Sequence, residues 1–278
     1  IVGCANFADE WEKWSDWEVI DCHYDKDPVY SVHRSNQNPV HMLTSYVRDV
    51  GNSLGISLYP KEHKGDIYLS KGEYGLMSIP HERHNVQRYW VLSLGGGKRD
   101  FTSKWYIPEH VQKIVDYFRG RIQFVQVGKA NDRHHYQPDL QGVIDLRGQT
   151  DVRQLIRVIH SSCGVLSGVT STMHLAAAVP LPTWQRRPRP CVIVAGGREP
   201  RTWYSYPTHR ILESVGTLPC CRDGGCWHAR TVPLNDGTDS DKRLCERVIG
   251  GHPKCMTMIR PESVILEIER YLDSEGIE

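Results

Sequence analysis

From Tyr89 onward the chain of 278 residues predicts an α/β fold built on a doubly wound parallel sheet. Short apolar runs recur along this part of the sequence, most of them end at a glycine, and amphipathic segments separate them. Strands that alternate with helices form parallel sheets with helices on both faces. In such sheets ligands bind beyond the carboxyl ends of the strands, so a binding site is expected there.

The expected elements follow in order along the chain. A helix is expected to begin at Pro108, because proline in the first helical turn loses no hydrogen bond. Thr150 is expected to cap the next helix, and a small-residue helix should follow Gly168. A last helix should bury an apolar face made of Val264, Ile265, Ile268 and Leu272. The expected strands cover residues 89–94, 122–128, 143–146, 163–168 and 191–197.

The first part of the chain gives a weaker pattern. Residues 41–54 have helical spacing and stop at Gly55, residues 66–69 are a short strand candidate, and the polar segment 78–86 suits a linker. We therefore expect an incomplete N-terminal domain over 1–87 and a second domain over 88–278. Ile1-Val2-Gly3-Cys4 has the pattern of a strand interior, which favours an N-terminal truncation or an incomplete gene prediction.

Composition excludes some function classes. Hydrophobic residues make up 39% of the chain and the formal net charge is +1, so nothing favours nucleic acid or an acidic membrane as a partner. No apolar run approaches the roughly 20 residues of a transmembrane helix, and no secretory signal is evident. A cytoplasmic location is expected.

The segment that follows the strand ending at Gly168 is the most informative. Thr170, Ser171 and Thr172 stand where the next helix begins. Free N–H groups at a helix start, together with hydroxyl groups, form a phosphate site. Simple N-capping by Ser and Thr is the alternative interpretation.

Cysteines are unevenly distributed. Cys4, Cys22, Cys163 and Cys191 are scattered, whereas the other five lie within 36 residues: Cys220, Cys221, Cys226, Cys245 and Cys255. A dense cluster in a chain with cytosolic character indicates a metal site. A reduced cluster without metal, or two disulfides, are the alternatives.

The sequence around His174 resembles glycosyltransferase family 9, the ADP-heptose heptosyltransferases. Val165–Gly168 leading into Met173-His174-Leu175-Ala176-Ala177-Ala178-Val179-Pro180 matches the family's strand, polar turn and helix start. The resemblance implies a GT-B fold and donor contacts from Thr170, Ser171, Thr172 and His174. Many members have Asp at the position of Val169 and Gly at that of Ser171, which puts part of the sugar recognition in doubt.

Other segments match the family in the same order, over roughly residues 88–275. Leu94–Gly97 followed by Lys104-Trp105 resembles a segment whose lysine approaches the donor phosphates, with Lys98 as the competing candidate. Gly128 ends the next strand, and Asp145–Gly148 resembles the turn before the following helix. Trp203 and Tyr206 are candidates for stacking on adenine, or else core residues.

The cysteine-rich segment resembles the subgroup of protein O-heptosyltransferases that modify autotransporters, in which clustered cysteines bind iron. Gly224-Gly225 provides a short turn for such a site. The expected ligands are Cys221, Cys226, Cys245 and Cys255, with Cys220 as the alternate. Thiolate ligands fit iron and zinc equally. Four thiolates leave no open position, so the metal's role would be structural.

The resemblance implies inverting transfer of heptose from ADP-heptose, or a related ADP-sugar, to a hydroxyl of a protein or saccharide. The family's catalytic base lies in the N-terminal domain; Asp9, Asp21 and Asp66 are acids there, and none is singled out. A donor-binding or assembly module without catalysis is the alternative, and a homo-oligomer is compatible with either. The absence of G-x-G-x-x-G after an early strand disfavours a dehydrogenase or epimerase.

Overall fold

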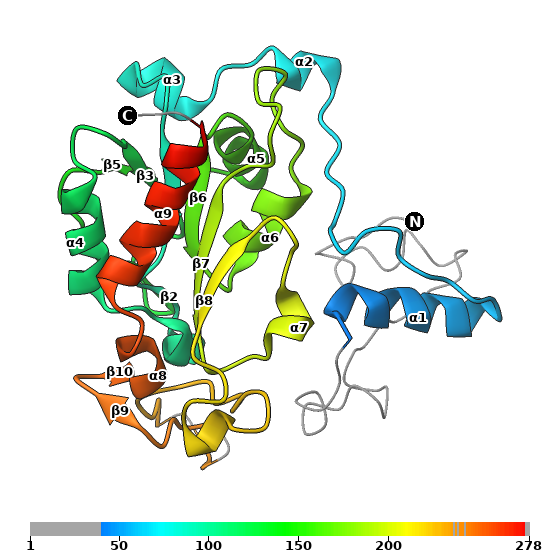
Figure 1. The fold of residues 1–278 in the computed structure, drawn as a ribbon, viewed down its shortest axis with the longest axis vertical. Helices are drawn as coiled ribbons and strands as arrows, with labels where there is room; N and C mark the ends of the chain where they lie inside the picture. The colour runs from blue at the N-terminus through cyan, green and yellow to red at the C-terminus, as the bar shows by residue number, and fades with distance from the viewer. Residues whose placement is uncertain (1–39, 236, 238, 242, 276–278) are drawn as a thin grey trace.

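The computed structural model describes residues 40–235, 237, 239–241 and 243–275, with a parallel sheet at the centre (Figure 1). The six strands lie in the order β5-β3-β1-β6-β7-β8, and every adjacent pair is parallel. In chain order the strands are β1 Trp90–Ser93, β3 Phe124–Gln126, β5 Ile144–Asp145, β6 Gly164–Gly168, β7 Cys191–Gly196 and β8 Arg210–Glu213. The predicted α/β fold with a doubly wound parallel sheet is therefore confirmed.

Helices cover both faces of the sheet (Figure 1). The helices α4 (Pro108–Tyr117) and α9 (Pro261–Glu275) pack together on one face, and α5 (Val152–His160) and α6 (Ser171–Ala178) pack on the other. In β1, Trp90 and Leu92 join the cluster beneath α4 and α9, and Val91 joins the opposite cluster. Because both faces are covered, β1, β6 and β7 have nearly continuous apolar runs rather than an alternating pattern.

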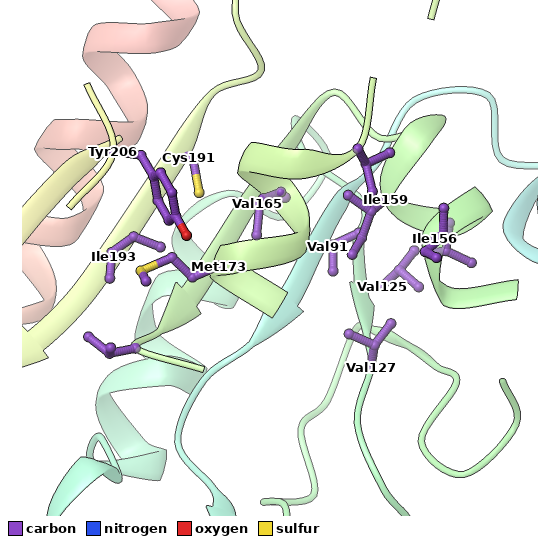
Figure 2. Packing of buried hydrophobic residues seen from close by; sticks show 14 of the residues in the cluster. Val91, Val125, Val127, Ile156, Ile159, Val165, Met173, Cys191, Ile193 and Tyr206 are labelled. Carbon is purple, nitrogen blue, oxygen red and sulfur yellow. The ribbon is translucent and has the colours of Figure 1, made fainter. Parts of the chain in front are cut away.

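Figure 2 shows the cluster on the α5 and α6 face, where side chains of four strands meet two helices. Val91, Val125, Val165 and Ile193 point from the sheet into this layer. Met173 of α6 is fully buried among them. This packing fixes α6 against the sheet, so the start of the helix is held at the carboxyl ends of the strands.

Several short elements lie outside the central sheet. Near the strand ends are β2 (Gly97–Lys98), the 3₁₀ helix η4 (Arg99–Lys104) and β4 (His135–Tyr136). After β7 come α7 (Arg201–Tyr204) and, beyond β8, the 3₁₀ helix η5 (Pro219–Cys221), β9 (Val248–Ile249), β10 (His252–Pro253) and α8 (Lys254–Thr257). The N-terminal part contributes α1 (Met42–Leu54), α2 (Lys71–Tyr74) and α3 (Ile79–His84).

Three expectations about local structure were wrong. Residues 66–69 pair with no strand, and the segment 78–86 contains α3, which begins near Pro80 and ends at Asn85 in the left-handed conformation. The cap of α5 is Asp151 rather than Thr150: its side chain accepts from the N–H of Gln154, whose side chain accepts from the N–H of Asp151. Asp151 and Gln154 together form a capping box at the start of α5.

The helix predicted over 41–54 is confirmed as α1, and Gly55 ends it in the left-handed conformation with φ 66°. The division of the chain at residue 87 stays a prediction. Asp9 and Asp21 lie outside the described residues, and the Asp66 side chain is 91% exposed beside Lys64. None of the helices among the described residues is long and apolar enough to cross a bilayer.

Candidate functional site

A pocket of about 600 Å³ lies at the carboxyl edge of the sheet. Its walls come from the segments that follow β1, β3, β5 and β6, which is where a doubly wound sheet places its ligands. Five of the predicted donor-binding residues line it: Lys104, Gly128, Thr170, Ser171 and Thr172. The structure thus brings together residues that the sequence separates by up to 68 positions.

The start of α6 forms one wall of the pocket. Thr170 is the N-cap residue, but its side chain does not cap the helix and lies 3.1 Å from the Ser167 hydroxyl instead. The first N–H groups of a helix have no partner within the helix, and the helix dipole makes this end positive. Thr170, Ser171 and Thr172 line the pocket beside these groups, so this wall suits an anion.

Lys104 brings a positive charge to the same pocket. Its ammonium nitrogen lies 2.7 Å from a carboxylate oxygen of Glu199 and 3.4 Å from the carbonyl oxygen of Val169, which accepts a hydrogen bond from it. Burial lowers the pKa of Lys104, and the Glu199 carboxylate opposes that shift. Glu199 also pairs with the guanidinium of Arg198, so one buried carboxylate lies between two cations.

Glycines allow the pocket walls to approach closely. A Cβ at Gly96 would lie 2.3 Å from the carbonyl oxygen of Tyr136. Gly128 has φ 143°, and a Cβ there would lie 2.8 Å from the side-chain nitrogen of Gln137. A side chain at Gly96 would push the backbone of β4 out of the pocket wall, and one at Gly128 would displace the Gln137 side chain.

The other three predicted donor-binding residues do not line this pocket. Trp203 and Tyr206 are 8% and 4% exposed and belong to the hydrophobic cluster of Figure 2, as the core alternative expected. Trp203 packs edge-on against Trp227. His174 lies one helical turn inside α6, and its Nδ1 is 2.7 Å from the Tyr206 hydroxyl. Burial, and then the charge of Lys104, lower the pKa of His174 to about 4, so it is neutral at pH 7.

Five cysteines of the C-terminal segment lie near one another, and charge on neighbouring thiols disfavours the thiolate forms of Cys220, Cys226 and Cys255. The five are Cys220, Cys221, Cys226, Cys245 and Cys255. Burial, followed by this mutual repulsion, raises the pKa of Cys226 to about 12 and that of Cys255 to about 11.

Cys221 is the least exposed of these five. It is 1% exposed, and its thiol donates to the carbonyl oxygens of Ser214 and Leu218. Within the described residues, no three His, Cys, Asp or Glu side chains are arranged to hold a metal ion.

The predicted donor-binding residues omit Lys129 and Gln137, which line the pocket, and Glu199, which contacts the lining residue Lys104. Glu199 follows the strand that ends at Gly196-Gly197, so the rule that ligands lie beyond strand ends could have indicated it. Gln137 gave no such signal. It reaches the pocket because β4 pairs with β2 in an antiparallel ribbon that no local pattern predicts.

No protein-family model matches the chain, and no curated protein matches its sequence. Solved structures do match its fold. A family 9 glycosyl transferase from Veillonella parvula DSM 2008 is 12% identical with a TM-score of 0.57, and the match covers 95% of this chain and 65% of that one. TibC from enterotoxigenic E. coli H10407, described as an iron-containing dodecameric glycosyltransferase, is 12% identical with a TM-score of 0.52.

The match with TibC covers 92% of this chain and 58% of TibC, and a further TibC structure of equal similarity contains ADP-D-β-D-heptose. The chain therefore spans 58–65% of the length of these proteins. At such low identity these similarities concern the fold. The chain has an α/β fold that resembles the GT-B-type structures of family 9 glycosyltransferases.

Proposed function

We propose that the chain is a glycosyltransferase of the family 9 type that takes an ADP-sugar, ADP-heptose or a related compound, as its donor. One observation carries the proposal: the start of α6 and Lys104 flank a single pocket at the carboxyl edge of the sheet. A helix N-terminus and an ammonium group together suit a diphosphate. TibC, which shares the fold, binds ADP-D-β-D-heptose, and this supports the choice of donor.

The chemistry of transfer suits these groups. An acceptor hydroxyl attacks the anomeric carbon of the donor, a base takes the hydroxyl proton, and the bond from that carbon to the diphosphate oxygen breaks with inversion. Negative charge then grows on the leaving diphosphate. Lys104 and the N–H groups at the start of α6 would stabilise that charge without any proton transfer. Hydroxyl groups of Ser or Thr on a protein are the proposed acceptors, and the catalytic base remains unassigned.

A donor-binding module without catalysis is the second candidate, and Val169 favours it. Val169 lines the pocket and is 8% exposed, at the position where many family members carry Asp. An apolar side chain cannot bind a sugar hydroxyl by a hydrogen bond. Transfer of labelled heptose to a serine-rich acceptor protein separates the two candidates, because a binding module would take up the donor and transfer nothing.

Thermal unfolding with added nucleotides tests donor binding. A ligand that binds only the folded chain raises the midpoint temperature according to its concentration and affinity. ADP-heptose and ADP should raise the midpoint, and NAD should not. A shift with NAD and none with either ADP compound would contradict the proposal.

We also propose that the cysteine-rich segment binds one structural iron or zinc ion. The proximity of the five thiols supports a shared site, for which we propose Cys220, Cys226, Cys245 and Cys255 as ligands. This replaces Cys221 with Cys220 in the expected set, because the Cys221 thiol already donates to two carbonyl groups in the core. The thiols lose their protons on metal binding, and the positive charge of the ion would offset the repulsion between the thiolates so formed.

Metal analysis of the purified chain tests this second proposal. About one equivalent of iron or zinc is expected, since a four-thiolate site holds one ion. Cys220→Ser should lose the metal and Cys221→Ser should keep it. Retention in Cys220→Ser with loss in Cys221→Ser would restore the set expected from the sequence, and no metal in the wild-type chain would refute the site.

Light scattering tests the proposed homo-oligomer, which rests on the dodecameric assembly of TibC.

A further inference from the structure

Two unpaired polar groups belong to residues that line the pocket. Gln137 is 6% exposed and lines the pocket, yet no described residue gives its side-chain oxygen a hydrogen bond. The indole nitrogen of Trp105, another lining residue, is buried and equally unpaired among the described residues. A buried polar group without a partner costs about 1–3 kcal/mol. Among the described side chains that lack a partner, Gln137 and Trp105 are the two that line this pocket, where a ligand could pair with them.

The backbone of Gln137 is held firmly, which a recognition residue requires. The Gln137 N–H donates to the side-chain oxygen of Asn131 at 2.6 Å, and the Asn131 amide donates back to the Gln137 carbonyl at 3.0 Å. Arg147 donates to the same carbonyl at 3.0 Å. Asn131 and Arg147 thus hold the residue, and β4 before it also pairs with β2. Side chains mounted on a fixed backbone lose little entropy on binding.

We infer that Gln137 recognises the base of the bound nucleotide, with Trp105 beside it. This inference rests on the proposed function, which places the diphosphate at Lys104 and the start of α6. Rotation about its last side-chain bond lets the Gln137 amide present either its acceptor or its donor to the pocket. A nucleobase carries adjacent donors and acceptors on its edge, and glutamine pairs with such an edge in adenine.

The pocket that Gln137 lines also offers apolar and aromatic surface to a flat ring. The apolar parts of Val152 and Leu155, at the start of α5, line the same pocket. Trp105 packs against Tyr136 at 5.2 Å between ring centroids, so this wall is aromatic. Binding pockets for ligands of this kind combine apolar walls with a few fixed polar groups.

Titration calorimetry of the full chain with ADP and with inorganic pyrophosphate tests the inference. Gln137→Met keeps the length of the side chain and removes the amide. It should weaken ADP binding about tenfold, the equivalent of one lost hydrogen bond, and leave pyrophosphate binding within about twofold. Gln112→Met, on α4 and outside the pocket, is the matched control and should change neither affinity.

The thermal midpoint supplies a second readout. Replacing a buried amide that lacks a partner should leave the midpoint unchanged or raise it. If Gln137→Met fails to fold, Gln137→Asn, which withdraws the amide from the pocket, should show the same selective loss of ADP affinity. Unchanged ADP affinity in the variant would overturn the inference, as would an equal loss for pyrophosphate. If the wild-type chain binds pyrophosphate but not ADP, the inference fails while the phosphate site stands; if it binds neither, the proposed function itself fails.

Discussion

At the scale of single residues, Glu199 controls the charge of the pocket. It is 7% exposed, and its carboxylate contacts both Lys104 and Arg198. The Arg198 guanidinium is held further by the carbonyl oxygen of His228 at 2.9 Å and by the ring of Phe101. Because one carboxylate lies between two cations, the three side chains carry a net charge of +1. This charge can attract the diphosphate of a donor.

Glu199→Gln should destabilise the fold strongly. Removing the anion leaves two buried cations facing each other, and breaking a buried pair costs about 3–5 kcal/mol. Lys104→Met in the same chain should recover much of that loss, because it removes one of the two cations. Urea unfolding of the two single variants and the double variant measures this coupling. Additive changes in the free energy of unfolding would show that Glu199 and Lys104 act independently. Lys113→Met, at an exposed position on α4, is the control for the loss of a lysine.

At the scale of elements, the ribbon of β2 and β4 closes one side of the pocket. Gly97 pairs with Tyr136 and Lys98 with His135. The approach is close because Gly96 has no side chain: a Cβ there would also lie 2.8 Å from the Cα of Gln137. Both atoms in the way belong to the backbone, so the ribbon could accommodate a methyl group only by moving.

Gly96→Ala should therefore weaken nucleotide binding by displacing β4 and Gln137. We expect a loss of at least tenfold in ADP affinity and a fall of about 1–3 kcal/mol in the free energy of unfolding, as overpacking typically costs. Gly72→Ala in α2, where the nearest atom is 4.0 Å away, is the control and should be neutral or slightly stabilising. Wild-type ADP affinity in Gly96→Ala would contradict the role given to this ribbon.

The elements also show what local sequence can predict. The strands β1, β6 and β7 were predictable because burial on both faces gives continuous apolar runs that end at glycine. The strand β8 was not expected, because its end residues Arg210 and Glu213 are polar and only Ile211 and Leu212 between them are aliphatic. It is a strand because it pairs with β7. The helix α3 was hidden in a polar segment, because only Ile79 and Pro80 of it are buried.

The residues of the site were predictable where polar side chains closely follow the end of a strand. Thr170, Ser171 and Thr172 come immediately after β6, and all three line the pocket. Tyr206 was a poor candidate for stacking because its ring fills the core beside Ile193 (Figure 2). Gln137 depends on a tertiary pairing between residues about 40 positions apart, and single-sequence patterns do not report such contacts.

At the scale of the whole molecule, a group of buried histidines joins the N-terminal part to the sheet domain. The ring of Tyr206 lies edge-on to His41, His174 and His209, at 5.6, 5.7 and 5.0 Å between centroids. His41 caps α1, and His174 belongs to α6, so the two parts of the chain meet at one aromatic ring. Burial lowers the pKa of each of these histidines, and the pKa of His174 and of His209 falls to about 4.

These histidines should make the fold sensitive to mild acid. The unfolded chain takes up protons at an ordinary histidine pKa of 6.5, but the folded chain resists until about pH 4. Unfolding therefore binds protons between these values, and the free energy of unfolding falls as the pH drops from 6.5 towards 4. Each pKa unit corresponds to about 1.4 kcal/mol, so His209 alone should contribute a loss of roughly 3 kcal/mol over the window.

Urea unfolding at several pH values, in the wild-type chain and in His209→Gln, isolates this contribution. Both chains lose the contributions of salt-bridged carboxylates equally, so the difference between the two curves reports His209. The variant should be less stable at pH 7.5, where the imidazole fills its buried site, and the two stabilities should converge as the pH approaches 4. Parallel curves across this range would mean that His209 is protonated in the folded chain as readily as in the unfolded one, contrary to its burial at 5% exposure.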